Sequence, residues 1–220
     1  MPKKLNTKHF LILSILLSVF FLSCQQAVAD IDQANYSVIF DYENEGQLPS
    51  SRLSLFIQSK SDVRRYERVQ VTSKKSGYVW TYDDLTLFLE NNQQWAGNTN
   101  LVVPENTEIP DGLYEVIYFN SDGKNDKVYI TVDYDKFIYS LSSDEIESYM
   151  EKENAKKKII IFDENGYILY FGDKTEEFDS VRGIWNKFSN AQSFQNIWEG
   201  KGNTVICIMP AQKVQLESEN

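Results

Sequence analysis

Histidine and cysteine are almost missing from this 220-residue sequence. The only histidine is His9, and the two cysteines are Cys24 and Cys207. His9 lies in an N-terminal segment that is expected to be removed, so the remaining chain would contain no imidazole. This excludes a Ser-His-Asp or Cys-His catalytic site, an imidazole general base and a histidine-ligated zinc or haem.

Two other common motifs are also missing. The sequence contains no Cys-x-x-Cys pair, and "GKGNT" (200–204) lacks the first glycine and the spacing of a phosphate-binding loop. Cys207 lies in the apolar run "TVICIMP", where we expect a buried small hydrophobic residue. A disulfide partner for Cys207 exists only if Cys24 remains a free thiol. We therefore expect no cofactor and no metal site, and a fold that depends on its apolar core.

The sequence also has no apolar run long enough to span a membrane. Its longest such run, Phe10 to Leu22, has 13 residues including serines, whereas a spanning helix needs roughly 18. Lys3, Lys4 and Lys8 precede the run, and no acidic residue occurs before Asp30. A basic start followed by a short apolar core and small residues predicts an export signal, residues 1–23.

Basic residues are scarce once this leader is removed. The whole chain has 22 basic and 32 acidic residues, and the leader takes three lysines, which leaves 19 against 32 and a formal charge of −13. Such a charge repels phosphate backbones, so we expect no nucleic-acid partner. It also repels anionic lipid headgroups, so membrane attachment would require a lipid.

The end of the leader, "FFLSCQQAVAD" (20–30), contains two competing cleavage signals. Cleavage after Ala27-Val28-Ala29 would release a secreted or periplasmic protein beginning at Asp30. Ser23-Cys24, preceded by Phe21 and Leu22, instead resembles the relaxed lipidation motif of spirochaete-type bacterial lipoproteins. That resemblance implies that Cys24 is acylated and anchors the chain to the outer or inner membrane of the cell envelope. Lipidation is favoured because it gives Cys24 a role at the apolar boundary, with residues 24–34 as the tether.

Residues 35–135 show the alternating pattern of half-buried antiparallel strands. "YSVIFDY", "RLSLFIQ", "YEVIYF" and "KVYITVDY" each place apolar residues on one face, and "YERVQV", "YVWTY" and "NLVVP" add further candidates. Turn residues separate them, among them the hairpin turn expected in "NSDGKND" (120–126). The segment 83–97 fits less well and is expected to hold a helical turn or a long loop. About seven strands in this length predict a β-sandwich.

The stretch "EIPDGLYEVIYFNSDGKNDKVYITV" (108–132) resembles the closing hairpin of bacterial immunoglobulin-like or fibronectin III-like modules. The resemblance rests on the Pro-Asp-Gly turn, the Tyr-x-Val strand and the Asp-Gly turn before the last strand. It implies an immunoglobulin-like β-sandwich used for spacing or binding, with Trp80 as the expected core tryptophan. It implies no catalytic residue.

Residues 136–212 have a different pattern, which predicts a small α+β domain. Ser142 and Glu145 have the spacing of a capping box before a short helix with Ile146 and Met150 on one face. "KKIIIFDENGYILYFG" is two apolar runs joined by Asn-Gly, a strong hairpin signal. A helical stripe of Phe178, Val181, Trp185 and Phe188, the strand around Cys207 and a flexible tail (213–220) complete the expected order.

The candidate functional residues are of three kinds. Asp41, Glu43 and Glu45, or Asp133 and Asp135, could bind a cation or act in a glycosidase, although a solvated face is the commoner reason for such runs. Trp95 and Trp198 lie in polar stretches and are expected to be exposed, where they could stack on sugars or anchor a protein. Arg64 and Arg68, expected with Tyr66 on one strand face, could meet an acidic ligand.

The sequence thus predicts a mainly β, lipid-anchored envelope protein that acts as a non-enzymatic binding or interaction module for a protein or glycan. The alternatives are a carboxylate-dependent glycan hydrolase and a secreted carbohydrate-binding protein that uses the two tryptophans.

Overall fold

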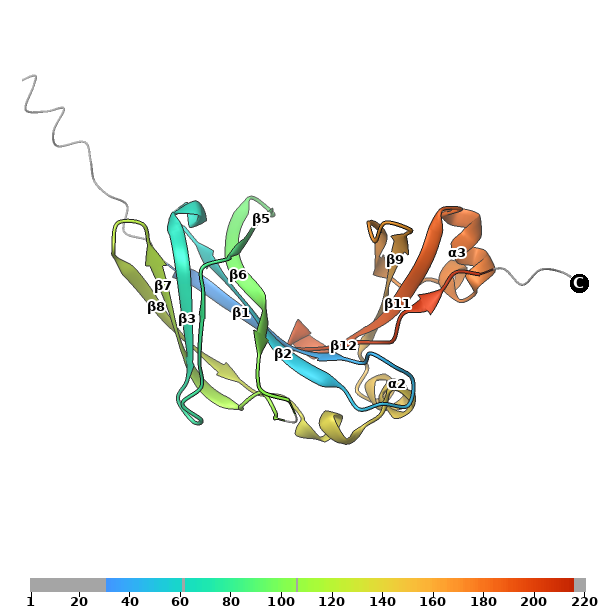
Figure 1. The fold of residues 1–220 in the computed structure, drawn as a ribbon, viewed down its shortest axis with the longest axis horizontal. Coiled ribbons are helices and arrows are strands. Elements are labelled where there is room, and N and C mark those ends of the chain that lie inside the picture. Colours follow the sequence, from blue (N-terminus) through green and yellow to red (C-terminus); the bar gives the residue numbers. More distant parts are fainter. Residues whose placement is uncertain (1–30, 61, 106, 216–220) are drawn as a thin grey trace, which may run out of the picture.

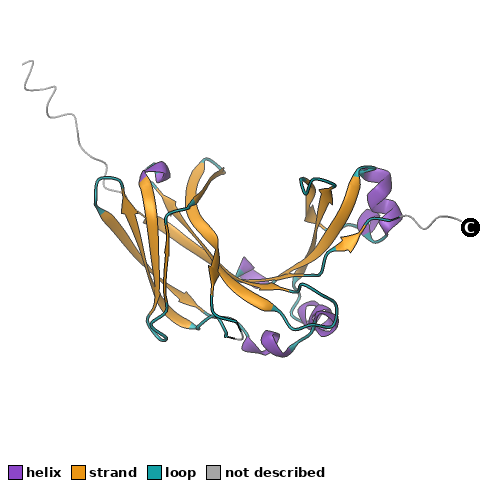
Figure 2. Ribbon diagram, in the orientation of Figure 1, coloured by secondary structure: helices purple, strands orange, loops and turns teal. Residues whose placement is uncertain are grey.

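A computed structural model describes residues 31–60, 62–105 and 107–215 of the chain. These residues form a mainly β structure of two sheets with a few short helices (Figures 1 and 2). Pairing is antiparallel except between β1 and β12, which are parallel. The predicted mainly β class is therefore confirmed.

The strands and helices follow one another along the chain in two groups. The first group contains β1 (Ile31–Asp41), β2 (Ser50–Ser59), η1 (Val63–Arg65), β3 (Tyr66–Ser73), β4 (Val79–Tyr82), β5 (Thr86–Glu90), β6 (Gln93–Val102), β7 (Gly112–Asn120) and β8 (Asn125–Val132). The second group contains η2 (Lys136–Ser140), α2 (Ser143–Lys152), β9 (Lys156–Asp163), β10 (Ile168–Asp173), η3 (Glu176–Phe178), α3 (Val181–Lys187), β11 (Ala191–Glu199), η4 (Lys201–Asn203), β12 (Val205–Ile208) and β13 (Gln212–Lys213).

Nine strands form one sheet in the order β10-β9-β11-β12-β1-β2-β6-β5, with β13 paired to β11 outside this path. The remaining four form a second sheet in the order β4-β3-β7-β8. The larger sheet crosses the domain boundary expected near residue 135, because β12 pairs with β1 from Val205 opposite Val38 to Ile208 opposite Asp41. The two groups of elements therefore share one sheet.

The predicted strand faces of the first group are confirmed. Val38 and Phe40 on β1 and Leu53 and Leu55 on β2 are buried, as are Tyr114, Val116 and Tyr118 on β7. These residues and Val71 of β3 belong to one apolar cluster, so the four-stranded sheet packs on this face of the nine-stranded sheet. Figure 1 shows the smaller sheet beside β1, β2 and β6.

The face of the nine-stranded sheet on which the smaller sheet packs is also covered in the second group of elements, there by helices. Phe40 lies opposite Cys207, which lies opposite Trp198, and Ile146 and Met150 of α2 join their cluster. Further along, Phe178 and Ile184 from η3 and α3 pack on Ile159 and Ile161 of β9. Figure 1 shows α3 on the outer side of β11 and β9. No helix in the described part of the chain packs against the opposite face in these clusters.

Local sequence signals explain several element ends. The Asn165-Gly166 hairpin is confirmed, since Gly166 adopts a φ of 79° between β9 and β10. The "NSDGKND" turn is likewise a hairpin, closed by the Asn120 N–H donating to the Lys124 carbonyl at 3.0 Å. The helix start at Ser142 is confirmed too: Glu145 Oε2 accepts from the Ser142 N–H at 3.0 Å and from its hydroxyl at 2.9 Å.

Four expectations about elements are wrong. Segment 83–97 is not helical; it forms β5 and the start of β6, joined at Asn91-Asn92. Residues 31–34, expected in the tether, belong to β1. The polar stretch around Trp198 is strand β11, which pairs with β9 along its length. The predicted tail begins too early, because β13 pairs with β11 and Val214 is buried.

The predicted helical stripe is correct only in part. Phe178 is buried in η3, but α3 spans only Val181–Lys187, and Ile184 faces the core instead of Trp185. The apolar spacing correctly indicated a helix but extended it across a break at Asp179 and Ser180. Cys207 is fully buried as predicted, and burial raises the pKa of its thiol to about 12.

Candidate functional site

The structure contains a groove of about 1220 Å³. It lies where the end of β1, the β1–β2 connection, the segment after β6, and strands β11 and β12 meet. The residues that line it and that matter for its chemistry are Asp41, Leu48, Pro49, Arg52, Val102, Pro104, Glu108, Tyr139, Gln195 and Ile208. Because these residues come from both halves of the chain, the groove exists only through the β1–β12 pairing.

The one arginine of the groove is already neutralised. Arg52 Nε donates to Asp41 Oδ2 at 2.7 Å, and Arg52 Nη1 donates to the Thr99 carbonyl at 2.7 Å. Both side chains of the ion pair are about three-quarters buried, which reduces screening by solvent. The guanidinium therefore fixes the shape of the groove and leaves little positive charge to attract an anion.

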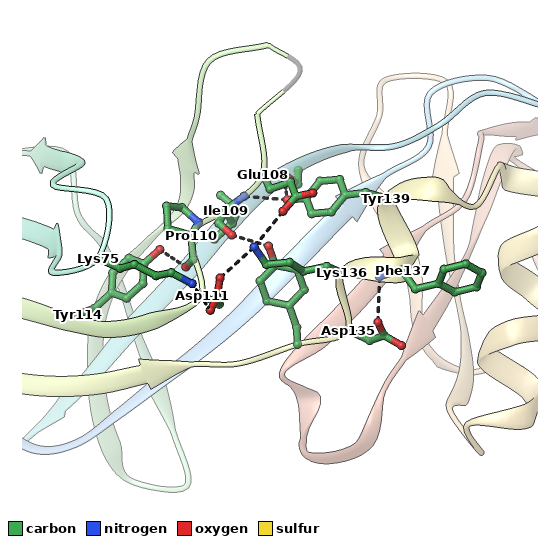
Figure 3. Close-up of polar contacts among 12 residues, drawn as sticks. Lys75, Glu108, Ile109, Pro110, Asp111, Tyr114, Asp135, Lys136, Phe137 and Tyr139 are labelled. Atoms are coloured by element: carbon green, nitrogen blue, oxygen red, sulfur yellow. Dashed lines mark hydrogen bonds and ion pairs between the residues drawn. The ribbon is translucent and has the colours of Figure 1, made fainter.

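One wall of the groove is held by a network of tyrosine and lysine contacts (Figure 3). The Tyr139 hydroxyl accepts a hydrogen bond from the Ile109 N–H at 2.8 Å and lies 2.7 Å from the Ser51 hydroxyl oxygen. Lys136 Nζ lies 2.9 Å from carboxylate oxygens of both Glu108 and Asp111. These contacts join η2 to the segment before β7 and to Ser51 of β2, so both sides of this wall are held in place.

The same network changes the acidity of Asp111. Lys75 Nζ donates to Asp111 at 2.7 Å, and Lys136 contacts its other oxygen. The hydrogen bond from Lys75, followed by that from Lys136, holds the pKa of the Asp111 carboxyl well below its usual range. The carboxylate is therefore a structural ion-pair partner, and it is unsuited to act as a general acid.

The carboxylate runs singled out from the sequence do not form a shared acidic centre. Asp41 is paired with Arg52, whereas Glu43 and Glu45 are exposed in the loop that follows. Asp135 accepts from the Tyr149 hydroxyl at 2.6 Å and from the Phe137 N–H at 2.9 Å. The residues that the structure describes contain no group of three or more histidine, cysteine or acidic side chains placed to hold a metal ion.

The expectation that Trp95 and Trp198 are exposed is wrong. Their exposed fractions are 6% and 3%. Trp95 stacks on Phe88 of β5 with an interplanar angle of 8°, and Lys157 Nζ lies 4.7 Å from the centroid of the Trp198 ring. Neither indole offers an open face on which a sugar could stack.

The two arginines also lie elsewhere than expected. Arg64 is in η1 and forms a two-pronged ion pair with Asp62, at 2.7 Å for the closest atoms, so it neutralises one of the chain's own carboxylates. A register shift between Tyr66 and Arg68 turns Tyr66 inward and leaves Arg68 outside, with its guanidinium 4.3 Å from the Phe119 ring centroid. The predicted shared face of Arg64, Tyr66 and Arg68 is therefore wrong.

Cys24 and the two cleavage signals lie outside the described residues. Among those that are described, no helix is long and apolar enough to cross a membrane. No family model, curated protein or solved structure matches the chain.

The groove was missed by sequence reasoning because its residues are scattered from Asp41 to Ala211. Arg52 and Tyr139 carry no local motif, and only the pairing of β1 with β12 brings their surroundings together. Leu48, 60% exposed beside Pro49, was the one available signal: an apolar residue in a polar connection.

Proposed function

We propose that this protein is an exported bacterial lipoprotein, anchored through Cys24, whose β-rich body acts as a non-enzymatic binding module in the cell envelope. The observation that carries the proposal is the position of Cys24. It follows Ser23 directly at the end of the apolar run of a basic leader, in a chain with only two cysteines. The other cysteine, Cys207, is buried in β12 and has its own structural role.

The tether fits this arrangement. β1 begins at Ile31, so only six residues, Gln25 to Asp30, separate Cys24 from the folded body. An acylated lipoprotein cysteine carries more than one chain, and two chains suffice for stable anchoring. A formal charge of −13 after the leader supplies no basic patch that could hold an anionic membrane surface, which makes the lipid necessary.

The body is proposed to begin with an immunoglobulin-like sandwich. Its strand orders support this, because β1-β2-β6-β5 and β4-β3-β7-β8 follow the A-B-E-D and C′-C-F-G orders of such folds. Tyr114 near the start of β7 donates to the Pro110 carbonyl at 2.6 Å, as the tyrosine corner of these folds does. Trp80 is buried on β4, next to the strand that carries the core tryptophan in antibody domains.

The groove is the surface proposed to bind an envelope protein or glycan. Two pairs of its polar side chains are engaged with each other, Arg52 with Asp41 and Tyr139 with Ser51, and Leu48, Val102 and Pro104 add apolar lining, which favours recognition by shape and apolar contact. A site built in this way from paired side chains lacks a poised acid and nucleophile, so binding is favoured over glycan hydrolysis.

The anchor is tested by labelling cells that express the full chain with an alkyne analogue of palmitate. The parent should incorporate the label and partition into detergent, whereas Cys24→Ser should not. Cys24→Ser is compared with Cys207→Ala, which removes the other thiol and should leave labelling unchanged. Mass spectrometry of the mature N-terminus completes the test, since a peptide beginning at unmodified Asp30 would contradict the proposal.

The binding role is tested by placing a photo-crosslinking amino acid at Leu48, on the rim of the groove, in intact cells. A discrete adduct is expected at this position. The matched control is Leu113 on β7, which is 47% exposed and does not line the groove. Equal adduct patterns at the two positions, or none at either, would argue against the groove as the binding surface.

A further inference from the structure

The edge strand β5 is unusually open for the end of a large sheet. All five of its residues, Thr86–Glu90, are exposed, and the exposed fractions of Leu87, Phe88 and Leu89 are 42%, 40% and 66%. β5 pairs with β6 on one side and with no other strand in the described chain. An exposed apolar edge of this kind is a template for another β-strand.

The turn that precedes β6 determines which backbone groups of β5 are free. Asn91 and Asn92, with φ values of 50° and 61°, make a two-residue turn, so the flanking Glu90 and Gln93 form a hydrogen-bonded pair. Hydrogen-bonded and non-hydrogen-bonded pairs alternate along an antiparallel ladder, so the backbone N–H and C=O of Phe88 also point towards Trp95 of β6. The N–H and C=O groups of Leu87 and Leu89 consequently point to the open edge.

We propose that the occupant of this edge is a second copy of the same chain, paired antiparallel through β5 about a two-fold axis at Phe88. In that register Leu87 lies opposite the partner's Leu89, Phe88 opposite Phe88 of the partner subunit, and Thr86 opposite the partner's Glu90. The pairs are apolar with apolar, aromatic with aromatic and hydroxyl with carboxylate, and each type stabilises a ladder.

The same register also avoids charge repulsion between opposed residues. Glu90 is the only charged residue of β5, and it falls opposite the partner's Thr86; the ladder ends there because Asn91-Asn92 turns the chain back into β6. A strand whose sequence is complementary to its own reverse suits a two-fold symmetric interface, in which both copies present the same patch. The pairing uses residues of the folded body alone and does not depend on Cys24.

The side chains extend surfaces that already exist. Phe88 contacts Phe56 and Trp95, with ring centroids 5.2 and 6.2 Å apart, so the ring of a second copy would continue an aromatic row. Leu87 and Leu89 lie on the other face of β5, and the partner's two leucines would cover them. Dimerisation would thus bury Leu87, Phe88 and Leu89 of each copy.

The other edges are poorer templates. β10 also exposes apolar residues, but its pairing with β9 shifts register between Ile168 and Tyr170, and an irregular edge resists further pairing. β8 carries Asp126 and Lys127 at its start, and β4 has only four residues. β5 alone combines regular pairing, apolar side chains and a self-complementary register.

A five-residue interface is smaller than that of a permanent dimer, so the association should be weak and reversible. The net charge of the mature chain opposes the approach of two copies at low ionic strength, and salt screens this repulsion. Dimerisation should therefore strengthen as salt is raised from low to physiological concentration.

Sedimentation velocity of the mature full-length protein, in density-matched detergent over a concentration series, tests the pairing. The parent should shift towards a dimer with increasing protein and salt, and Leu89→Lys should remain a monomer. Because Leu89 is mostly exposed, this variant should fold, which circular dichroism would verify. The matched control Tyr167→Lys introduces the same charge at a residue 71% exposed near β10 and should dimerise like the parent.

A disulfide test locates the axis. Phe88 would face its symmetry mate in a non-hydrogen-bonded pair, where Cα atoms are about 4.5 Å apart, so Phe88→Cys should yield a disulfide dimer on mild oxidation. Phe171→Cys on β10 should cross-link far more slowly. A monomeric parent at every concentration and salt, or a dimer abolished by Tyr167→Lys and kept by Leu89→Lys, would overturn the proposal.

Discussion

The buried hydroxyl of Tyr114, at the start of β7, is expected to contribute measurably to the stability of the fold. Its side chain is fully buried, it stacks near Trp80, and its hydroxyl donates to the Pro110 carbonyl at 2.6 Å. Tyr114→Phe keeps the ring and removes this bond. We expect the free energy of unfolding to fall by about 1–2 kcal/mol, since a buried acceptor loses its donor. Urea denaturation followed by circular dichroism measures the change.

The matched control is Tyr129→Phe on the neighbouring strand. The Tyr129 hydroxyl donates to Glu115 at 2.8 Å, but its side chain is 52% exposed and water can replace the bond. Its effect should stay within about 0.5 kcal/mol. Equal losses for the two variants would show that the Tyr114–Pro110 hydrogen bond contributes no more to stability than a solvent-exposed one.

Residue identity in the sequence was a poor guide to exposure for the tryptophans. Trp95 and Trp198 sit among polar neighbours, yet each is buried by residues from another strand, Phe88 of β5 and Lys157 of β9. Alternation within β7 or β2 was reliable because one face of each strand meets the core. Burial that depends on a partner strand requires the sheet order, which a single sequence does not contain.

At the scale of elements, the sequence signal was strong for one hairpin turn and weak for another. Asn165-Gly166 was recognised because glycine readily takes a positive φ, whereas Asn91-Asn92 joins β5 to β6 with two non-glycine residues at positive φ. Without glycine the turn signal is weaker, so 83–97 was interpreted as a helical turn or a loop. Strand β11 was missed for a related reason, because its polar residues conceal the buried Phe194, Ile197 and Trp198.

This comparison predicts opposite effects for two substitutions. Asn92→Gly creates the preferred Asn-Gly pair at a φ of 61° and should stabilise the β5–β6 hairpin by up to about 1 kcal/mol. Gly166→Ala places a Cβ at a φ of 79° and should destabilise the β9–β10 hairpin by about 1 kcal/mol, although no atom lies within 4 Å of that Cβ. Amide hydrogen exchange in each hairpin measures both effects, and changes of the same sign would contradict the explanation.

At the scale of the whole molecule, the parallel β1–β12 pair makes the two groups of elements one structure. The sequence indicated both groups, including a Cys207 strand that is apolar on both faces. It did not indicate that this strand would join the first sheet, because parallel pairing across about 165 residues leaves no local trace. The groove, the shared core and the position of α2 all follow from this one connection.

The shared core also determines how the molecule responds to alkali. Tyr42, Tyr114 and Tyr118 are at most 2% exposed, and burial raises the pKa of each well above its ordinary value of 10.0. Above that pH an unfolded tyrosine loses its proton while the folded one keeps it, so the folded state binds more protons. The contribution of these tyrosines to the free energy of unfolding is therefore fully present below pH 10. It falls as the pH rises further, by about 1.4 kcal/mol per pH unit for each such tyrosine.

A titration to high pH should consequently show two groups of tyrosines. Tyrosines exposed to water should ionise first, seen as near-ultraviolet tyrosinate absorbance, while the circular dichroism of the sheets stays constant. The buried group should ionise only together with unfolding, in one transition for both halves of the chain because the sheet is continuous. Tyr118→Phe removes one buried phenol and should make the fall in stability with pH less steep than in the parent. Ionisation of every tyrosine while the sheets remain intact would show that this core is open to water.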